Sequence, residues 1–424
     1  MSLPSPHSGE DCDVIRSTLS PFPTSGFTQH VADDVPSDDT LQSSLLRVIG
    51  RGTCGTIFSR IHSNDAIALK VGRDTQALEN DVCLTDKVYS ACLDAQRLLQ
   101  KLFDKDIKIP RVPITCGFLD GLDSEWCEMH GVRLTDENEE AEDEEETHDE
   151  EELEEDENES EDEEENEDER TNLSKPTSIF ALTRIPSISP SAYQALRRHY
   201  TPSHPPTDNG VCLIRPYLGL PNRDTLGQPE NLWNLPMTLA DFLQCGITWP
   251  EIFHIAQEMA LGLATVHWGA GIDGMDMEFV LGGEQGWKPE GVYAPNVQVA
   301  SKIESSAEHT RTSSPPLQTH LYILDFDKAQ ALPRPLSPNR TIQALFVAIT
   351  CNDPYFPDPA AERGMEKQLW DVFKAAYLKA AHELIRRDRV AWGHDGLEWP
   401  GTVLEKWETW ARERREEGDG IEFG

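Results

Sequence analysis

The sequence Gly50-Arg-Gly52-Thr-Cys-Gly55-Thr-Ile-Phe58 is a glycine-rich loop that runs directly into a short segment of β-branched and aromatic residues. Glycines allow a tight turn in which backbone N–H groups approach phosphate oxygens closely. A dinucleotide-binding turn would lead into a helix, whereas the residues after Gly55 favour a strand. The sequence therefore predicts a phosphate-covering loop between two strands, with Gly50, Gly52 and Gly55 as binding residues. A plain β-hairpin is the alternative interpretation.

A lysine follows in the next predicted strand. Lys70 lies fifteen residues after Gly55, in Ala68-Leu-Lys70, where its ammonium group would hold nucleotide phosphates. Apolar residues at helical spacing then predict a helix over about 75–103. The partner of such a lysine should be an acidic residue of this helix, and both Glu79 and Asp81 are candidates. They follow Lys70 by only nine and eleven residues, which is shorter than usual in protein kinases, so a solvated helix residue is the alternative for either.

Two acidic residues with catalytic spacing occur further along the chain. Asp273 is followed five residues later by Glu278, and Phe279-Val-Leu281 then predicts a strand. In the catalytic loop of kinases, an aspartate at this place orients or deprotonates an acceptor hydroxyl, and a carboxylate in place of the usual Asn five residues on can ligate Mg²⁺ through oxygen. Asp276 is the alternative functional acid, or simply a turn residue. The catalytic loop of kinases usually carries a lysine two residues after the aspartate. Met275 stands at this position, so the predicted site lacks that cation.

The predicted strand over 321–326 ends in another acidic motif, Leu324-Asp-Phe-Asp327. A carboxylate at the end of a buried strand, followed by Phe, resembles the D-F-G metal-binding motif, so Asp325 is the predicted metal ligand. Asp327 replaces the glycine of that motif and adds a second carboxylate.

Together these motifs resemble the protein-kinase fold, because glycine loop, lysine strand, helix, aspartate loop and Asp-Phe strand occur in that order. The resemblance implies an α+β, two-lobed protein-kinase-like architecture, with a small β-rich N-lobe that carries one long helix and a mostly helical C-lobe. It also implies ATP and Mg²⁺ as cofactors. The implied activity is phosphate transfer to an acceptor that the sequence does not identify.

Two departures leave open whether the chain is an enzyme. Asp273 and Asp325 are 52 residues apart, a wide spacing, and no A-P-E motif follows. A fold alone does not confer activity. The alternative is therefore a catalytically inactive, pseudokinase-like interaction module.

A second resemblance rests on longer motifs. They are Arg184-Ile-Pro186, Cys212-Leu-Ile-Arg-Pro-Tyr-Leu-Gly219, Asn234-Leu-Pro-Met-Thr-Leu239, His267-Trp268, Asp273-Gly-Met-Asp-Met-Glu-Phe-Val-Leu-Gly282, Leu324-Asp-Phe-Asp327 and Asn352-Asp-Pro-Tyr-Phe-Pro357. In this order they resemble a fungal family catalogued as a domain of unknown function, whose members are often labelled "zinc finger protein". The resemblance covers about residues 178–385 and implies no particular activity.

Composition and periodicity divide the chain into five parts. These are a disordered arm (1–40), the N-lobe (41–133), an acidic disordered insert (134–177), the rest of the N-lobe with the hinge and the C-lobe (178–400), and a C-terminal helix and tail (401–424). A flexible loop is expected at 283–318, and helices at about 249–268, 366–387 and 402–416. The predicted hinge is 183–186, with 215–219 as the alternative.

The 424-residue chain has a formal net charge of −39, much of which comes from one acidic run. Residues 136–169 carry 26 carboxylates and no Lys or Arg, which leaves −13 for the remainder. This acidity opposes the basic face that nucleic-acid binding needs, so no direct nucleic-acid binding is expected. The run is either a solvated linker or a segment that docks an unknown protein partner, which would then be basic.

Nine scattered cysteines predict reduced thiols and a cytoplasmic or nuclear location. The close pair Cys127-Glu-Met-His130 has no second pair at zinc-finger spacing, so no zinc is expected. The Ser- and Pro-rich N-terminus lacks the apolar core of a signal peptide, and no run of eighteen apolar residues occurs. No membrane partner is therefore expected.

Overall fold

The computed structural model describes residues 46–52, 54–60, 67–103, 107–122, 177–200, 212–224, 226–229, 232–283, 319–333, 336–352, 354–393 and 395–416. The predicted arm, nearly all of the acidic insert, the loop after Gly283 and the tail after Glu416 lie outside the described residues.

The N-terminal part is a five-stranded antiparallel sheet with the order β1-β2-β3-β5-β4. Its strands are β1 (Leu46–Gly52), β2 (Gly55–Arg60), β3 (Ile67–Gly72), β4 (Thr115–Leu122) and β5 (Thr177–Thr183). Side chains alternate between the two faces of a strand. One face buries Phe58, Leu69, Val71, Ile179 and Ala181, and the other packs Phe180 against the helix α3. Lys70, which lies between Leu69 and Val71 and pairs with Phe180 across the sheet, therefore faces α3.

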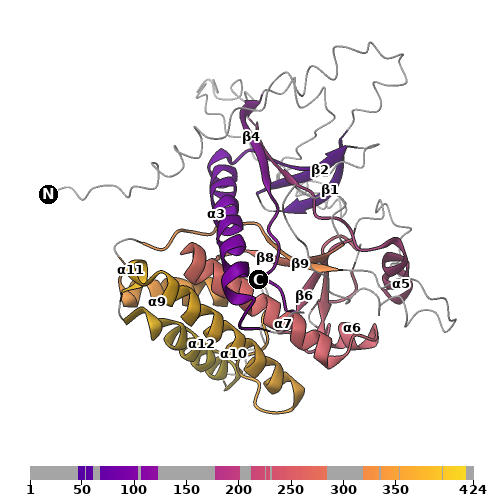
Figure 1. The fold of residues 1–424 in the computed structure, drawn as a ribbon. Coiled ribbons are helices and arrows are strands. Elements are labelled where there is room, and N and C mark those ends of the chain that lie inside the picture. The colour runs from indigo at the N-terminus through magenta and orange to yellow at the C-terminus, as the bar shows by residue number, and fades with distance from the viewer. Residues whose placement is uncertain are drawn as a thin grey trace, which may run out of the picture.

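The long helix α3 (Thr75–Leu99) links the sheet to the rest of the molecule. Asp74 caps its first turn by accepting a hydrogen bond from the amide of Ala77 at 2.9 Å. The helix packs its N-terminal half on β4 and β5 and its C-terminal half on the helical part of the chain. In Figure 1, α3 accordingly runs from the strands down to the helices. It ends four residues before the predicted end at Phe103.

A second, four-stranded sheet has the order β7-β6-β8-β9. It consists of β6 (Ile214–Tyr217), β7 (Leu235–Thr238), β8 (Glu278–Gly282) and β9 (His320–Leu324). β6 and β7 are parallel, and the other pairs are antiparallel. β6 includes residues 215–217 of the alternative hinge, and the chain leaves the first sheet at Thr183, where the preferred hinge begins. The position of the hinge stays a prediction.

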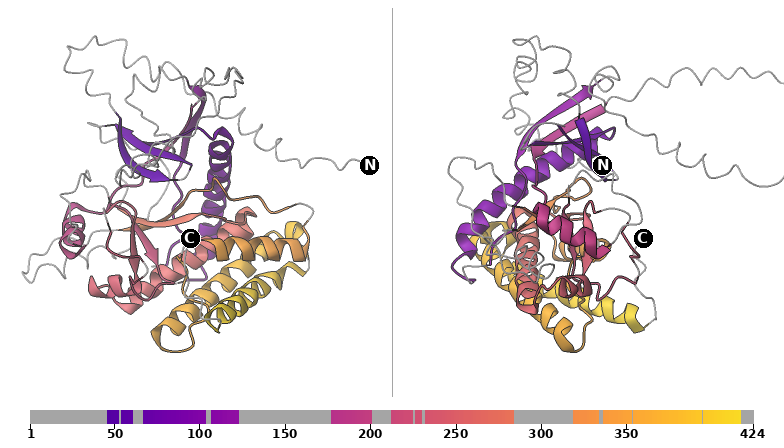
Figure 2. Two further views of the ribbon diagram at one scale, coloured as in Figure 1. Left: turned by 180° about the vertical axis from the view of Figure 1, so that it is seen from behind. Right: turned by 90° about the vertical axis from the view of Figure 1, so that its right-hand side faces the viewer.

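Helices make up most of the C-terminal part, as Figure 2 shows from two sides. They are α5 (Pro190–Tyr200), α6 (Leu239–Gln244), α7 (Trp249–Ala264), α9 (Pro338–Cys351), α10 (Gly364–Arg387), α11 (Arg389–Trp392) and α12 (Trp399–Glu416), with short turns η3 (Thr265–Ala270) and η4 (Asp395–Leu397). The predicted α+β class, with strands first and helices later, is confirmed. Within the described ranges no helix is long and apolar enough to cross a membrane.

The helix that leads to the aspartate loop starts at Trp249 as predicted, with Pro250 in its first turn. Its regular part ends at Ala264, and η3 continues with π-helical geometry to Ala270. The hydroxyl of Thr265 donates to the carbonyl of Leu261 at 2.7 Å, a contact that disturbs a helical ladder. Gly271 then adopts a left-handed backbone (φ 67°) and ends the helix before Asp273.

Candidate active site

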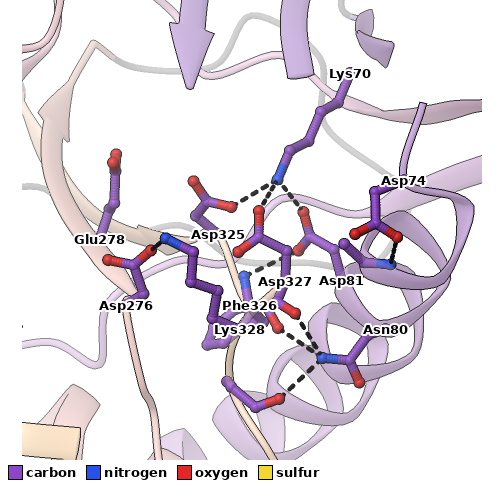
Figure 3. A network of polar contacts seen from close by, with 12 residues as sticks. Lys70, Asp74, Asn80, Asp81, Asp276, Glu278, Asp325, Phe326, Asp327 and Lys328 are labelled. Atoms are coloured by element: carbon purple, nitrogen blue, oxygen red, sulfur yellow. Dashed lines mark hydrogen bonds and ion pairs between the residues drawn. The ribbon is translucent and has the colours of Figure 1, made fainter. Parts of the chain in front are cut away.

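Lys70 lies at the centre of a buried cluster of carboxylates. Its Nζ is 2.8 Å from Asp81 Oδ2, 2.6 Å from Asp325 Oδ1 and 3.0 Å from Asp327 Oδ2. Figure 3 shows the three carboxylates converging on the ammonium group from α3 and from the segment after β9. The structure therefore brings together two residues that the sequence predicts for the site, Lys70 and Asp325.

The helical partner of Lys70 is Asp81 rather than Glu79. The two residues are about 200° apart around a helix axis, so only one of them can face the sheet. Asp81 is buried, and its Oδ1 also accepts a hydrogen bond from the Thr85 hydroxyl at 3.2 Å. Sequence spacing left both acids open, and the phase of α3 against β3 selects Asp81.

The charges of this cluster perturb one another. Burial alone would lower the pKa of Lys70, but the negative charges of Asp81, Asp325 and Asp327 raise it well above its ordinary value. Burial raises the pKa of Asp325 well above the usual range for aspartate, and Lys70 only partly offsets this effect. The pKa of Asp327 is lowered despite burial, chiefly by Lys70 and also by the thiol of Cys54. One cation thus faces three acidic groups, which leaves an excess of carboxylate.

Helix α3 also fixes the backbone that carries Asp325. The Asn80 amide donates to the carbonyls of Phe326, Asp327 and Ala329 at 2.9–3.2 Å, and the Phe326 amide donates to Asp81 at 3.0 Å. Asp325 itself has a left-handed backbone (φ 65°), which is unfavourable for a residue with a side chain. The contacts from α3 hold it there. Asn80 has no motif that marks it in the sequence.

The glycine loop reaches the same cluster. Gly52 and Gly55 pair across the turn between β1 and β2, and the intervening Cys54 lies close enough to Asp327 to lower its pKa. A Cβ atom on Gly55 would lie 2.5 Å from the carbonyl oxygen of Val71 in β3. Glycine is therefore required at 55 because β2 and β3 approach closely there.

Asp273 lies in the loop after η3, where backbone hydrogen bonds hold its side chain. The amides of Gln330 and Met275 donate to its Oδ1 at 2.8 and 3.1 Å. Burial raises the pKa of Asp273, and these bonds partly counter that effect. The residue borders a cavity of about 660 Å³ that it shares with the segment after Asp327 and with α9.

The buried His267 anchors the Asp273 loop. Its Nε2 is 3.1 Å from the carbonyl oxygen of Asp273 and its Nδ1 is 2.9 Å from the Tyr377 hydroxyl. A carbonyl only accepts, so Nε2 carries the hydrogen, and the Tyr377 hydroxyl donates to Nδ1 while accepting from Trp268 Nε1 at 2.8 Å. Burial lowers the pKa of His267 to about 3, in keeping with this neutral tautomer. In the sequence, only the His267-Trp268 motif of the second resemblance marks this histidine.

Asn352 holds the same loop from the other side. Its Oδ1 accepts from the Asp276 amide at 2.6 Å and its Nδ2 donates to the Gly274 carbonyl at 3.0 Å. Asp276 has a left-handed backbone (φ 59°), and its carboxylate pairs with Lys328 at 2.7 Å. The motif that begins at Asn352 thus positions the aspartate loop, a role that its sequence did not reveal.

Glu278, the second predicted metal residue, forms an ion pair with Arg215 of β6. Its charge contributes to the raised pKa of Asp325, so the two are electrostatic neighbours. Among the described residues, the carboxylates that lie close enough to share one ion are instead those of Asp81, Asp325 and Asp327, each of which offers one oxygen within 4.8 Å of the other two. Oxygen donors of this kind suit a hard cation such as Mg²⁺.

A family model described as "Zinc finger protein", for a domain of unknown function, matches residues 321–389. The match covers β9, the Asp325 segment, α9 and α10, which is the C-terminal part of the range over which the sequence resembles such a family. It supports that resemblance over these residues. Among the residues that the structure describes, the one cluster of metal-ligating side chains contains carboxylates alone. Neither a curated protein nor a solved structure matches the chain.

Proposed function

We propose that this chain is an ATP- and Mg²⁺-dependent phosphotransferase with a protein-kinase-like organisation. The observation that carries the proposal is the contact of Lys70 with an acid from α3 and with the Asp-Phe acid after β9. Kinases need a pair between such a lysine and a helix acid, and an acid of the Asp-Phe motif beside it to hold Mg²⁺; the pair of Lys70 with Asp81 and the position of Asp325 are consistent with this arrangement. The sheet order and the glycine loop over the same cluster add support.

The residues of the cluster suit the cofactors. Backbone N–H groups of the loop over 50–55 and the ammonium group of Lys70 would hold the phosphates. Asp325 and Asp327 would hold Mg²⁺, which when bound neutralises charge on the transferred phosphoryl group. With all groups ionised, Lys70 and its three acids sum to a charge of −2, which one divalent cation balances.

Asp273 is the proposed catalytic residue. Its carboxylate would accept the proton of the acceptor hydroxyl or orient that hydroxyl for attack. His267 and Asn352 keep its loop in place through backbone contacts and are positioning residues. Glu278 could ligate a second Mg²⁺ only by giving up its contact with Arg215.

A pseudokinase-like interaction module is the second candidate function. The ion pair of Glu278 with Arg215 and the occupation of Lys70 by three carboxylates favour it, because both engage groups that catalysis would need. In this case ATP would bind without turnover, or not at all. The acidic run would then serve as the docking segment for a basic protein.

Thermal unfolding of the full chain with Mg²⁺-ATP, with ATP plus EDTA and without nucleotide tests the proposal. Ligand that binds only the native state raises the melting temperature by mass action. We expect a Mg²⁺-dependent rise for the wild type that is lost in Lys70→Met and Asp325→Asn. Lys70→Arg keeps a positive charge among the three acids. It is the control for a loss of the melting-temperature rise that is caused by misfolding alone. No rise at millimolar Mg²⁺-ATP in the folded wild type would contradict the proposal.

Asp273→Asn separates the enzyme from the interaction module. This variant should keep the Mg²⁺-ATP shift but lose at least about 100-fold in ADP production, since proton transfer by a positioned side chain contributes about 10²–10⁴-fold. Equal ADP production by the variant and the wild type would remove Asp273 from the mechanism. A wild type that binds Mg²⁺-ATP but releases no ADP would support the module.

A further inference from the structure

The cavity beside Asp273 has the size and position of an acceptor site. Its volume of about 660 Å³ falls within the range of small-molecule pockets. The walls come from three places in the chain: the aspartate loop, the segment after Asp327, and α9. The lining residues are Asp273, Met275, Lys328, Gln330, Asn339, Arg340, Gln343, Ala344 and Val347.

One face of α9 forms the wall that shares the cavity with Asp273. Asn339, Gln343 and Val347 follow each other at four-residue spacing, and Arg340 and Ala344 lie beside them, so all five share this face. Met275, Ala344 and Val347 supply apolar surface that can contact a carbon skeleton. The amides of Gln330, Asn339 and Gln343 supply polar groups that can bind hydroxyls.

The α9 wall of the cavity favours an anion, although Asp273 adds a negative charge to the lining. Lys328 is already neutralised by Asp276 at 2.7 Å. Arg340, by contrast, forms no ion pair with any residue that the structure describes. Lys406 donates a hydrogen bond to Gln343 Oε1 and brings a further positive charge next to the wall. A guanidinium group binds carboxylate or phosphate with two parallel hydrogen bonds.

We propose that the acceptor of this chain is a small hydroxylated molecule with an anionic group. The carboxylate or phosphate of that molecule binds Arg340 and its carbon skeleton contacts Met275, Ala344 and Val347. One of its hydroxyls meets the carboxylate of Asp273. The inference rests on the proposed role of Asp273 in phosphate transfer.

Isothermal titration of the full chain with and without Mg²⁺ and a non-hydrolysable ATP analogue tests this inference. The probes are gluconate and glucose 6-phosphate as anions, glucose as their neutral counterpart, choline as a cation and a serine peptide without acidic residues. We expect at least one anion to bind at least tenfold more tightly than glucose, choline and the peptide. The gluconate and glucose 6-phosphate arms distinguish a carboxylate site from a phosphate site.

Arg340→Gln should weaken binding of the preferred anion at least tenfold, because the amide keeps the length of the side chain but loses the charge. Arg97→Gln, at an exposed arginine of α3 away from the cavity, is the matched control and should bind as the wild type does. The inference is overturned if neither anion binds, if glucose, choline or the peptide binds as well, or if Arg340→Gln binds unchanged. These outcomes differ from a failure of the proposed function. A missing Mg²⁺-ATP shift alongside Arg340-dependent anion binding would refute the phosphotransferase but keep the anion site.

Discussion

Hydrogen bonds around the Tyr377 hydroxyl tie α10 to the aspartate loop. This one group donates to His267 and accepts from Trp268, and His267 in turn donates to the Asp273 carbonyl. Tyr377→Phe would leave a buried indole N–H and a buried imidazole nitrogen without partners. We expect a loss of about 1–3 kcal/mol in the free energy of unfolding, measured by urea denaturation.

Tyr89→Phe is the control for this change, because the partly buried Tyr89 packs against the same core without a described hydrogen-bond partner for its hydroxyl. It should alter stability by much less. Equal stability of Tyr377→Phe and the wild type would show that the network contributes nothing to folding.

The buried Glu258 makes stability depend on pH. Burial raises the pKa of Glu258 from 4.5 to about 8, although its carboxyl accepts a hydrogen bond from the Lys108 amide at 3.1 Å. Between these two values the folded protein holds a proton that the unfolded chain has released. The free energy of unfolding should therefore fall as pH rises from about 5 to 8, by roughly a few kcal/mol from this group.

Glu258→Gln keeps the hydrogen-bond acceptor and removes the titration. Urea denaturation at pH 5.5 and pH 8.5 should show a smaller decrease for this variant than for the wild type. Glu405→Gln, at an exposed position of α12, should leave the decrease unchanged. If the Glu258→Gln variant and the wild type lose stability equally over this pH range, Glu258 is ionised in the folded protein.

At the scale of elements, the turn between β1 and β2 depends on the close approach of β2 to β3. In Gly55→Ala the new methyl group would meet the Val71 carbonyl oxygen at 2.5 Å, so the strands must separate. We expect a loss of about 1–3 kcal/mol in stability and weaker Mg²⁺-ATP binding, because the loop moves with β2. Denaturation and nucleotide titration measure the two effects.

Gly52→Ala is the matched control within the same loop. Its Cβ would lie 3.9 Å from the nearest atom outside its neighbours, the Gly55 carbonyl oxygen, so the methyl group fits. If both variants lose stability and Mg²⁺-ATP binding to a similar extent, glycine is needed for flexibility of the loop and not for the close approach of β2 to β3.

Local patterns predicted those elements whose signals lie within one segment. Pro250 marks the start of α7, and the apolar strands around Lys70 and Asp325 are where alternation and turn residues place them. Helix α9 was not predicted, although Pro338 and the apolar positions over 342–349 carry a helical signal. The parallel pairing of β6 with β7 has no local signal in the sequence, because the two strands come from separate segments of the chain.

The site could be predicted only for residues that belong to motifs. Lys70 and Asp325 come together as expected, whereas the choice of Asp81 over Glu79 depends on how α3 rotates against β3. Asn80, Asn352 and Arg215 act through long-range contacts with backbone or with one carboxylate. Nothing in the spacing of the sequence encodes such contacts.

At the scale of the whole molecule, the acidic run lies between paired strands. Leu122 at the end of β4 and Thr177 at the start of β5 are partners in the sheet, so the ends of the intervening segment lie side by side. Replacing residues 125–174 with a short Gly- and Asn-rich turn should keep the melting temperature within a few degrees, because loop length contributes weakly to stability. The Mg²⁺-ATP shift should also persist. Loss of cooperative melting would show that the segment is needed for folding.

The same shortened variant tests the docking role of the acidic run. If the run binds a basic partner through charge, core histones should bind the wild type at low salt and fail to bind the variant. Equal binding by both proteins, or by neither, would favour a solvated linker.

The sheet order β3-β5-β4 also has a consequence for a chain that is cut. β5 belongs to the C-terminal stretch but lies between two strands of the N-terminal stretch, and hydrogen bonds join it to both. A protease that cleaves within residues 123–176 would therefore yield two fragments that remain interlocked until the sheet unfolds. Separate expression of 1–122 and 177–424 offers a split protein, whose reassembly would report on folding of the first sheet.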